Sequence, residues 1–195
     1  MNGLVVLASA SPRRRELLHQ VGLMPEIIPS RIKEAVTGRE PGQIVQELSR
    51  QKAEDVFSVC EKREGPMVVI GADTVVSVDG KILGKPGSEA EAVQMIGLLQ
   101  GREHQVYTGV FMIFGPSGER LAFAERTDVQ VCPMSREQIA WYVATGEPMD
   151  KAGAYGIQGY FAAFIEGIRG DYNNVVGLPV GRVCRELMGR GWRLF

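Results

Sequence analysis

The first residues that could do chemistry follow a short apolar segment near the amino terminus. Residues 3–8 form an unbroken apolar run, and Ser9-Ala10-Ser11-Pro12-Arg13-Arg14-Arg15-Glu16 comes directly after it. A helix that begins here presents unsatisfied backbone N–H groups, and hydroxyl and guanidinium groups add further donors to phosphate oxygens. Three arginines in a first helical turn oppose the helix dipole, and an anionic ligand would resolve that conflict. We therefore predict a phosphate site, with an ordinary capped helix and a solvated basic turn as the alternative.

A second candidate is the acidic residue within Gly71-Ala72-Asp73-Thr74-Val75-Val76. An aspartate in an apolar strand-forming run is costly to bury unless it is paired, hydrogen-bonded or bound to a metal. Asp73 therefore fits a rigidly held general base or Mg²⁺ ligand, whereas a structural aspartate satisfied by backbone amides is the alternative. Glu34 and Glu47 are further carboxylates, and Glu34 lies in a polar loop where a metal could be reached.

Two glycine-containing segments add a cation and an amide. Lys85 follows Gly84 and precedes Pro86, next to a turn, where a lysine is either solvated or aimed at phosphate. The stretch Asp150-Lys151-Ala152-Gly153-Ala154-Tyr155-Gly156-Ile157-Gln158-Gly159 places small residues where a backbone could approach a ligand closely. Its Gln158 can both donate and accept hydrogen bonds, as recognition of a base edge requires. Lys52 and His104 are isolated, and His104 alone is expected to be a turn or core histidine.

The elements that must position these residues alternate between strand and helix. We expect strands over residues 3–8, 24–29, 67–70, 75–78, 81–83, 105–114, 121–131 and near 161–168. We expect helices over residues 12–21, 41–63, 88–99, 135–145 and 179–188, with apolar residues such as Val45, Leu48, Val56, Val59 and Cys60 facing the core of the second.

Local signals support several of these boundaries. Asp79-Gly80 is typical of a tight hairpin, and Ser88 with Glu91, like Ser135 with Gln138, has the spacing of a capping box. A long hairpin formed by residues 105–114 and 121–131 rules out an all-parallel sheet. We predict one α/β domain over residues 1–195, in which helices flank a mixed, elongated sheet.

Composition limits the classes of protein to consider. The chain has 22 Lys and Arg against 23 Asp and Glu, and 45% of its 195 residues are hydrophobic. This near-neutral balance argues against coating of nucleic acid or of a membrane surface, and no apolar run approaches the length of a membrane span. Three cysteines without a C-x-x-C pair and only two histidines support neither a disulfide framework nor a His-based metal cluster. We expect a reduced, cytoplasmic protein.

Taken together, the segments resemble the Maf family of nucleoside triphosphate pyrophosphatases. The resemblance extends in order over nearly the whole chain and is carried by residues 7–14, 47–53, 71–76, 84–86, 101–109, 150–159 and 174–179. It implies hydrolysis of a nucleoside triphosphate between the α- and β-phosphates, with a divalent metal such as Mg²⁺ or Mn²⁺. It also implies a fold related to inosine-triphosphate pyrophosphatases, with a cleft between two lobes, and a homodimer.

The resemblance assigns roles to residues of this chain. Asp73 matches the family's catalytic carboxylate, and Glu34 together with Asp73 is expected to hold the metal. The expected phosphate-binding residues are Ser9, Arg13, Arg14, Lys52 and Lys85.

Arg13, Thr74 and Gln158 match the branch that prefers dTTP and UTP. Two alternatives stay open: the same chemistry on 7-methyl-GTP or inosine triphosphate, and a nucleotide-binding septation regulator with little catalysis. Nucleotide-pool house-cleaning, modified pyrimidine substrates and a link to cell-division arrest are all compatible with the resemblance.

Overall fold

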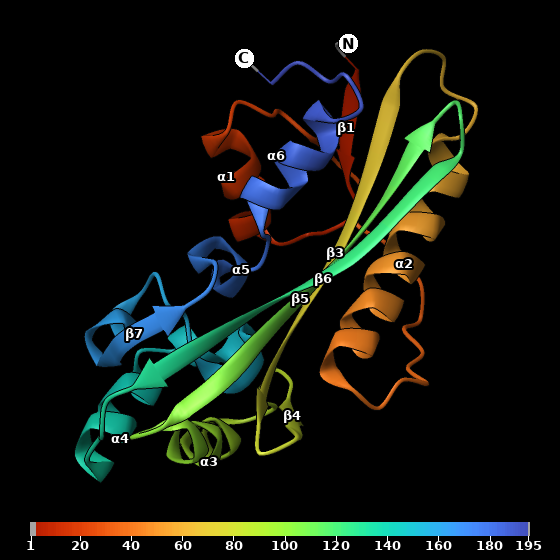
Figure 1. Ribbon diagram of the computed structural model, residues 1–195. Coiled ribbons are helices and arrows are strands. Elements are labelled where there is room, and N and C mark those ends of the chain that lie inside the picture. The colour runs from red at the N-terminus through yellow and green to blue at the C-terminus, as the bar shows by residue number, and fades with distance from the viewer. Residues whose placement is uncertain (1–2, 195) are drawn as a thin grey trace. The chain divides into compact units, whose positions relative to one another are not determined.

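The computed structural model describes residues 3–194, and strands and helices alternate along most of them (Figure 1). The strands are β1 (Leu4–Leu7), β2 (Glu26–Ile27), β3 (Met67–Val78), β4 (Lys81–Leu83), β5 (Glu103–Gly115), β6 (Glu119–Val131) and β7 (Ile165–Arg169). The helices are α1 (Pro12–Gln20), α2 (Pro41–Cys60), α3 (Glu89–Leu99), α4 (Arg136–Ala144), α5 (Tyr172–Val176) and α6 (Val180–Met188). Short 3₁₀ segments cover Glu147–Asp150, Ala152–Ala154 and Tyr160–Phe164.

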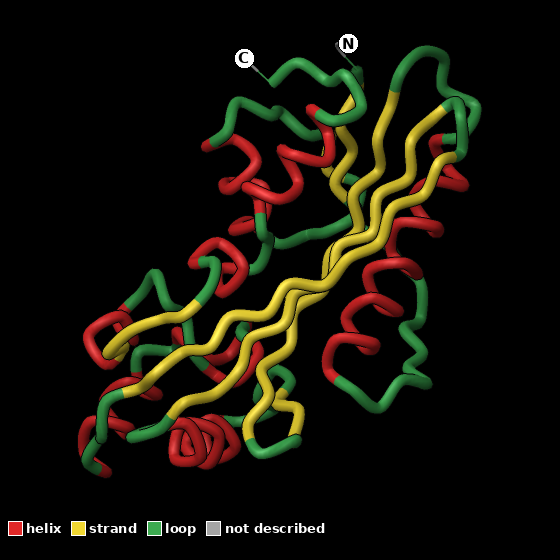
Figure 2. The backbone as a smooth tube through the Cα atoms, in the orientation of Figure 1, coloured by secondary structure: helices red, strands yellow, loops and turns green. Residues whose placement is uncertain are grey.

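All seven strands belong to one sheet, drawn in yellow in Figure 2. Its order is β2-β1-β3-β5-β6-β7, and β4 pairs with β3 beside this path. Strand β1 pairs in parallel with both β2 and β3, whereas β4 and β7 pair antiparallel with β3 and β6. The predicted α/β class with a mixed sheet is therefore confirmed.

Several local signals act as expected. Asp79 and Gly80 have φ angles of 50° and 74°, so the tight turn between β3 and β4 forms where the sequence predicts it. Ser135 and Gln138 make the complete capping box at the start of α4. At α3 the box is only half formed, because Ser88 accepts from the Glu91 N–H while the Glu91 carboxylate accepts from Gly87 instead.

Other expectations need correction. The two strands expected over residues 67–70 and 75–78 are one continuous strand, β3, which passes straight through Gly71 and Asp73. Strand β2 has only two residues, and α2 ends at Cys60 rather than at residue 63. Val59 was placed on the inner face of α2 but is 73% exposed, because the helical spacing puts its neighbours Val56 and Cys60 on the core side instead.

The residues group into two compact units. The first combines residues up to Asp73 with Thr108–Glu125 and residues from Gly177 onward, and the second combines Thr74–Tyr107 with Arg126–Val176. Residues 1, 2 and 195 of the predicted domain lie outside the described part, and the prediction of one domain over residues 1–195 stays a prediction.

In the first unit, α2 packs closely against the sheet because two strands present glycine to it (Figure 1). A Cβ atom on Gly71 of β3 would lie 2.2 Å from the carbonyl oxygen of Ser49, and one on Gly109 of β5 would lie 2.2 Å from that of Val45. Any larger side chain would push the helix away. The buried cluster at this contact includes Ala53 and Val56 of α2.

In the second unit, a glycine again permits close packing. Gly153 donates its N–H to the carbonyl oxygen of Gly84 at 2.9 Å, and a Cβ atom on it would lie 2.8 Å from a methyl carbon of Val76. This contact holds the segment after β4 beside the 3₁₀ turn of residues 152–154. Throughout residues 3–194, every helix is too short or too polar to cross a lipid bilayer.

Candidate active site

The junction between β1 and α1 holds one arginine in place by hydrogen bonds. Ser9 is 8% exposed, and its Oγ accepts from the Ser11 N–H at 3.3 Å and from Arg14 Nη1 at 2.9 Å. Arg14 Nε donates to the carbonyl oxygen of Gly177 at 2.8 Å. Ser11 is the N-cap residue with Pro12 in the first turn, as predicted, but its side chain makes no cap hydrogen bond.

Arg14 is therefore a buried cation rather than a member of a solvated basic turn. It is 9% exposed, and this burial lowers the pKa of its guanidinium group. The Asp73 and Glu34 carboxylates act in the opposite direction and Arg13 adds to the lowering, so these four charged groups influence one another. Arg13 is half-buried and Arg15 is exposed. The first unit thus brings a cationic cluster close to Asp73.

Lys52 connects the two carboxylates predicted to hold a metal. Its Nζ contacts Asp73 Oδ1 and lies 3.0 Å from Glu34 Oε1. The side chains of Lys52 and Asp73 are 16% and 15% exposed, whereas that of Glu34 is 48% exposed. The lysine, an isolated cation in the sequence and a phosphate-binding residue by the resemblance, is therefore the centre of the cluster.

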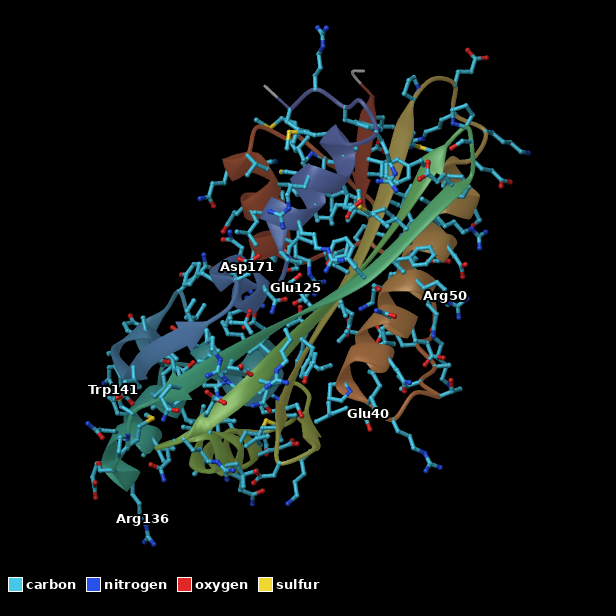
Figure 3. All side chains as sticks on the ribbon, viewed as in Figure 1. Glu40, Arg50, Glu125, Arg136, Trp141 and Asp171 are labelled. Carbon is cyan, nitrogen blue, oxygen red and sulfur yellow. The ribbon has the colours of Figure 1, made fainter. Side chains whose placement is uncertain are left out.

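The packing of α2 explains this contact. Gly71 and Asp73 are two residues apart on β3, so they share one face of the sheet, and Gly71 touches α2 at Ser49 and Ala53. Asp73 therefore faces the same helix, and Lys52, three residues after Ser49, lies on the matching helical face. Arg50 lies on the outer side of α2 (Figure 3), where it pairs with Glu54 at 3.2 Å.

A polar stripe on α2 fixes the loop that carries Glu34. Glu47 Oε2 accepts from the Thr37 and Gly38 N–H groups at 2.9 and 3.2 Å, and these bonds lower the pKa of Glu47. Gln51 accepts from the Ala35 N–H at 3.1 Å, and Asp55 accepts from Ser30 Oγ at 2.7 Å. Sequence reasoning missed this role, although the spacing of four residues between Glu47, Gln51 and Asp55 was a usable signal.

The donor set fits a hard divalent cation. Asp73 and Glu34 supply carboxylate oxygens that already share one cationic partner, and Mg²⁺ is commonly held by one or two carboxylates together with substrate phosphates. Among residues 3–194 there is no cluster of three or more His, Cys, Asp or Glu side chains that could hold a metal by themselves. These two carboxylates therefore suit a metal that arrives with a phosphate ligand.

The second unit contains the other predicted residues. Thr74 is half-buried on β3, directly after Asp73. Lys85 and Gln158 are exposed, Lys85 after β4 and Gln158 in a turn before the 3₁₀ segment Tyr160–Phe164. His104 is fully buried and its Nε2 lies 2.8 Å from Tyr155 Oη, which confirms the expectation of a core histidine.

Comparisons with known proteins identify similar chains. Relatives named dTTP/UTP pyrophosphatase occur in Agathobacter rectalis (49% identity, covering 96% of this chain and 97% of the relative) and Symbiobacterium thermophilum (50%, covering 98% and 96%). A third, from Carboxydothermus hydrogenoformans, is 50% identical and covers 96% of this chain and 99% of its own.

Two solved structures also match. They are a nucleoside-triphosphatase, dITP/XTP pyrophosphatase, from Mycobacterium abscessus (TM-score 0.44, 14% identity, covering 96% of this chain and 94% of the other) and the Staphylococcus aureus Ham1 protein (TM-score 0.42, 15% identity, covering 65% and 71%). The family model for Maf-like proteins matches residues 4–190. With this match and these relatives, the chain belongs to the Maf family.

Proposed function

We propose that this protein is a nucleoside triphosphate pyrophosphatase that hydrolyses dTTP and UTP to the nucleoside monophosphate and pyrophosphate. Membership of the Maf family and relatives named dTTP/UTP pyrophosphatase at 49% and 50% identity support this activity. The structural observation that carries it is the contact of Asp73 with Lys52 beside buried Arg14. This arrangement supplies an acid–base group among cations, which is what cleavage of a phosphoanhydride needs.

Positive side chains account for binding of the triphosphate. The substrate carries about four negative charges, so both its binding and its hydrolysis depend on charge neutralisation. In this proposal Arg13, Arg14 and Lys52 of the first unit and Lys85 of the second bind phosphate oxygens. Ser9 contributes by holding Arg14 in place through its hydroxyl group.

Asp73 acts on the attacking water in this mechanism. Its carboxylate orients the water and accepts a proton while the water oxygen bonds to the α-phosphorus. The bond from that phosphorus to the oxygen bridging the β-phosphate breaks, and pyrophosphate leaves. Lys52 contacts Asp73 through a flexible side chain, so a polyanionic substrate can attract its ammonium group and leave the carboxylate able to accept the proton.

Asp73 and Glu34 would hold a divalent cation such as Mg²⁺ or Mn²⁺. When bound, this ion would neutralise phosphate charge. General-base help typically accounts for about 10²–10⁴-fold in rate, so positioning and charge neutralisation must supply most of the remainder.

Gln158 is the proposed reader of the base, together with Arg13 and Thr74. It is exposed in a turn of the second unit, and its amide can make paired hydrogen bonds to the O4 and N3–H edge of a pyrimidine. A site that depends on such bonds rejects ligands that leave them unmade more strongly than a site that selects by size.

A panel of triphosphates at one concentration, incubated with purified protein and Mg²⁺, tests this proposal. We expect pyrophosphate and monophosphate, formed fastest from dTTP and UTP. Faster hydrolysis of 7-methyl-GTP or inosine triphosphate would replace the assignment of dTTP and UTP as substrates. Formation of the nucleoside diphosphate and orthophosphate would overturn the proposed cleavage between the α- and β-phosphates. Nucleotide binding without turnover would favour the septation-regulator alternative. Light scattering of the same sample tests the proposed homodimer.

A further inference from the structure

The Glu147 carboxylate lies at the centre of the segment that carries Gln158. Its Oε1 accepts a hydrogen bond from Tyr142 Oη at 3.0 Å, and its Oε2 accepts one from the Tyr160 N–H at 2.8 Å. Both partners belong to the second unit, as Glu147 does. One side chain therefore connects α4 with the backbone that follows Gln158.

The same network reaches the backbone before Gln158. The Gly156 N–H donates to Tyr142 Oη at 3.2 Å, and the Gly159 N–H donates to the Gly156 carbonyl oxygen at 3.2 Å. Gly156 and Tyr160 are the two ends of a five-residue turn with Gln158 at its midpoint. Both ends are therefore anchored to Glu147, one directly and one through the tyrosine hydroxyl.

Two glycines let this turn lie directly on charged side chains. A Cβ atom on Gly159 would lie 2.0 Å from Glu147 Oε2, and one on Gly156 would lie 2.6 Å from Lys151 Cε. Lys151 Nζ in turn donates to the Glu147 carbonyl oxygen at 2.7 Å. The Glu147 and Lys151 side chains thus occupy the space that a Cβ atom on either glycine would need.

The support beneath the turn is buried and aromatic. Tyr142 is fully buried, and its ring packs against Phe161 with 4.9 Å between the centroids. Burial and the neighbouring Glu147 carboxylate raise the pKa of Tyr142, so its hydroxyl stays protonated and keeps donating to Glu147. Trp141, the preceding residue on α4 (Figure 3), is 52% exposed, and its ring meets that of Tyr160 edge-on with 5.8 Å between the centroids.

We propose that Glu147 is a positioning residue that fixes the Gln158 turn and thereby sets the preference for pyrimidine bases. This inference rests on the proposed function and deepens it. Discrimination by paired hydrogen bonds requires the amide to be held in one orientation, because a mobile amide can satisfy several bases equally well. Glu147 is expected to act through the turn, without touching the nucleotide.

Glu147→Ala and Tyr142→Phe test the inference, with Glu166→Ala as a control. Glu166 is exposed on β7 in the same unit. The measurement is the ratio of kcat/KM for dTTP to that for dGTP, which does not depend on the fraction of correctly folded enzyme. We expect Glu147→Ala to reduce this ratio about tenfold, Tyr142→Phe to reduce it less, and the control to leave it unchanged. Equal loss on both substrates would show a merely structural role and overturn the inference.

Amide hydrogen exchange separates this inference from the proposed function. We expect the Gly156 and Tyr160 amides to exchange faster in Glu147→Ala and Tyr142→Phe than in the unmodified protein. Unchanged exchange would overturn the positioning role whatever the enzyme hydrolyses. If the unmodified protein released no pyrophosphate, the proposed function would fail while the exchange result still decided whether Glu147 fixes the turn.

Discussion

The surroundings of Asp73 and the turn around Gln158 hold their candidate functional residues by different means. Around Asp73, charged side chains contact each other, with Lys52 between two carboxylates. Around Gln158, backbone N–H groups donate to one carboxylate and one tyrosine hydroxyl. In the first arrangement a polyanionic substrate can compete with the carboxylates for the Lys52 ammonium group. The second arrangement consists of hydrogen bonds within the protein, which nucleotide binding leaves in place.

This difference matches two different tasks. Side chains that neutralise phosphates must change partners as the substrate binds and the product leaves, and a flexible lysine in an ion pair can do so. A side chain that discriminates between bases must keep the same orientation each time a nucleotide binds. A turn that is anchored at both ends can hold the side chain in that orientation. We therefore expect substitutions in the first region to change turnover and substitutions in the second to change preference.

The largest effect is expected for Asp73→Asn. The amide is nearly the same size but cannot accept the proton of the attacking water, so kcat should fall by about 10²–10⁴-fold or more. Pyrophosphate release measures the change, and circular dichroism checks that the fold is intact. Near-normal turnover by this variant would remove Asp73 from the mechanism.

Gly71→Ala tests whether helix packing places Lys52. The added Cβ would lie 2.2 Å from the Ser49 carbonyl oxygen, so we expect a loss of about 1–3 kcal/mol in the free energy of unfolding and a fall in turnover as α2 shifts. Urea denaturation measures the first quantity. Gly97→Ala is the matched control, because a Cβ atom there meets nothing within 4 Å and should stabilise α3. Equal stability of the two variants would contradict the packing argument.

Gln158→Glu should act on preference. The carboxylate can no longer donate to the base, so turnover of dTTP and UTP should fall about tenfold relative to that of the other triphosphates. Initial rates across the same panel of nucleotides measure it. A uniform loss over all substrates would mean that Gln158 does not read the base.

The smallest effect concerns pH and the buried His104. Burial lowers its pKa from 6.5 to about 4 in the folded protein. Between these values the unfolded chain binds more protons, so stability is complete above pH 6.5 and declines as the pH falls toward 4. We expect a loss of about 1 kcal/mol from about pH 7.5 to about pH 5.5, measured by urea denaturation, and a flatter profile for His104→Gln. An unchanged slope in the variant would assign the effect to other groups.

Local chemistry in the sequence was sufficient for much of the fold. The hairpin at Asp79-Gly80 and the capping box at Ser135 depend on neighbouring residues alone, and both form as predicted. The continuity of β3 through Gly71 was not predictable in this way. Glycine and aspartate there suggest a break, but the strand persists because α2 packs against that glycine from a distant part of the sequence.

The candidate site was predictable as a set of residue types and not as a set of contacts. Ser9 and Arg14 stood out because hydroxyl and guanidinium groups follow an apolar run at a predicted helix start, and Asp73 stood out because a carboxylate interrupts another apolar run. The contact of Lys52 with Asp73 depends on the approach of a helix to a strand, which no local pattern encodes. Glu147 was missed for the same reason, although the nearby glycines already indicated a close backbone approach.

The two outermost strands of the sheet limit how copies of this protein can associate. Strand β2 has two residues, and β7 has five that include Glu166 and Arg169. A short edge strand offers few backbone N–H and C=O groups for pairing with a strand of another molecule, and charged side chains on it make its burial in an interface unfavourable. We therefore expect that strands of different molecules do not pair edge to edge even at high protein concentration. Any stable assembly is expected to form through helices or loops.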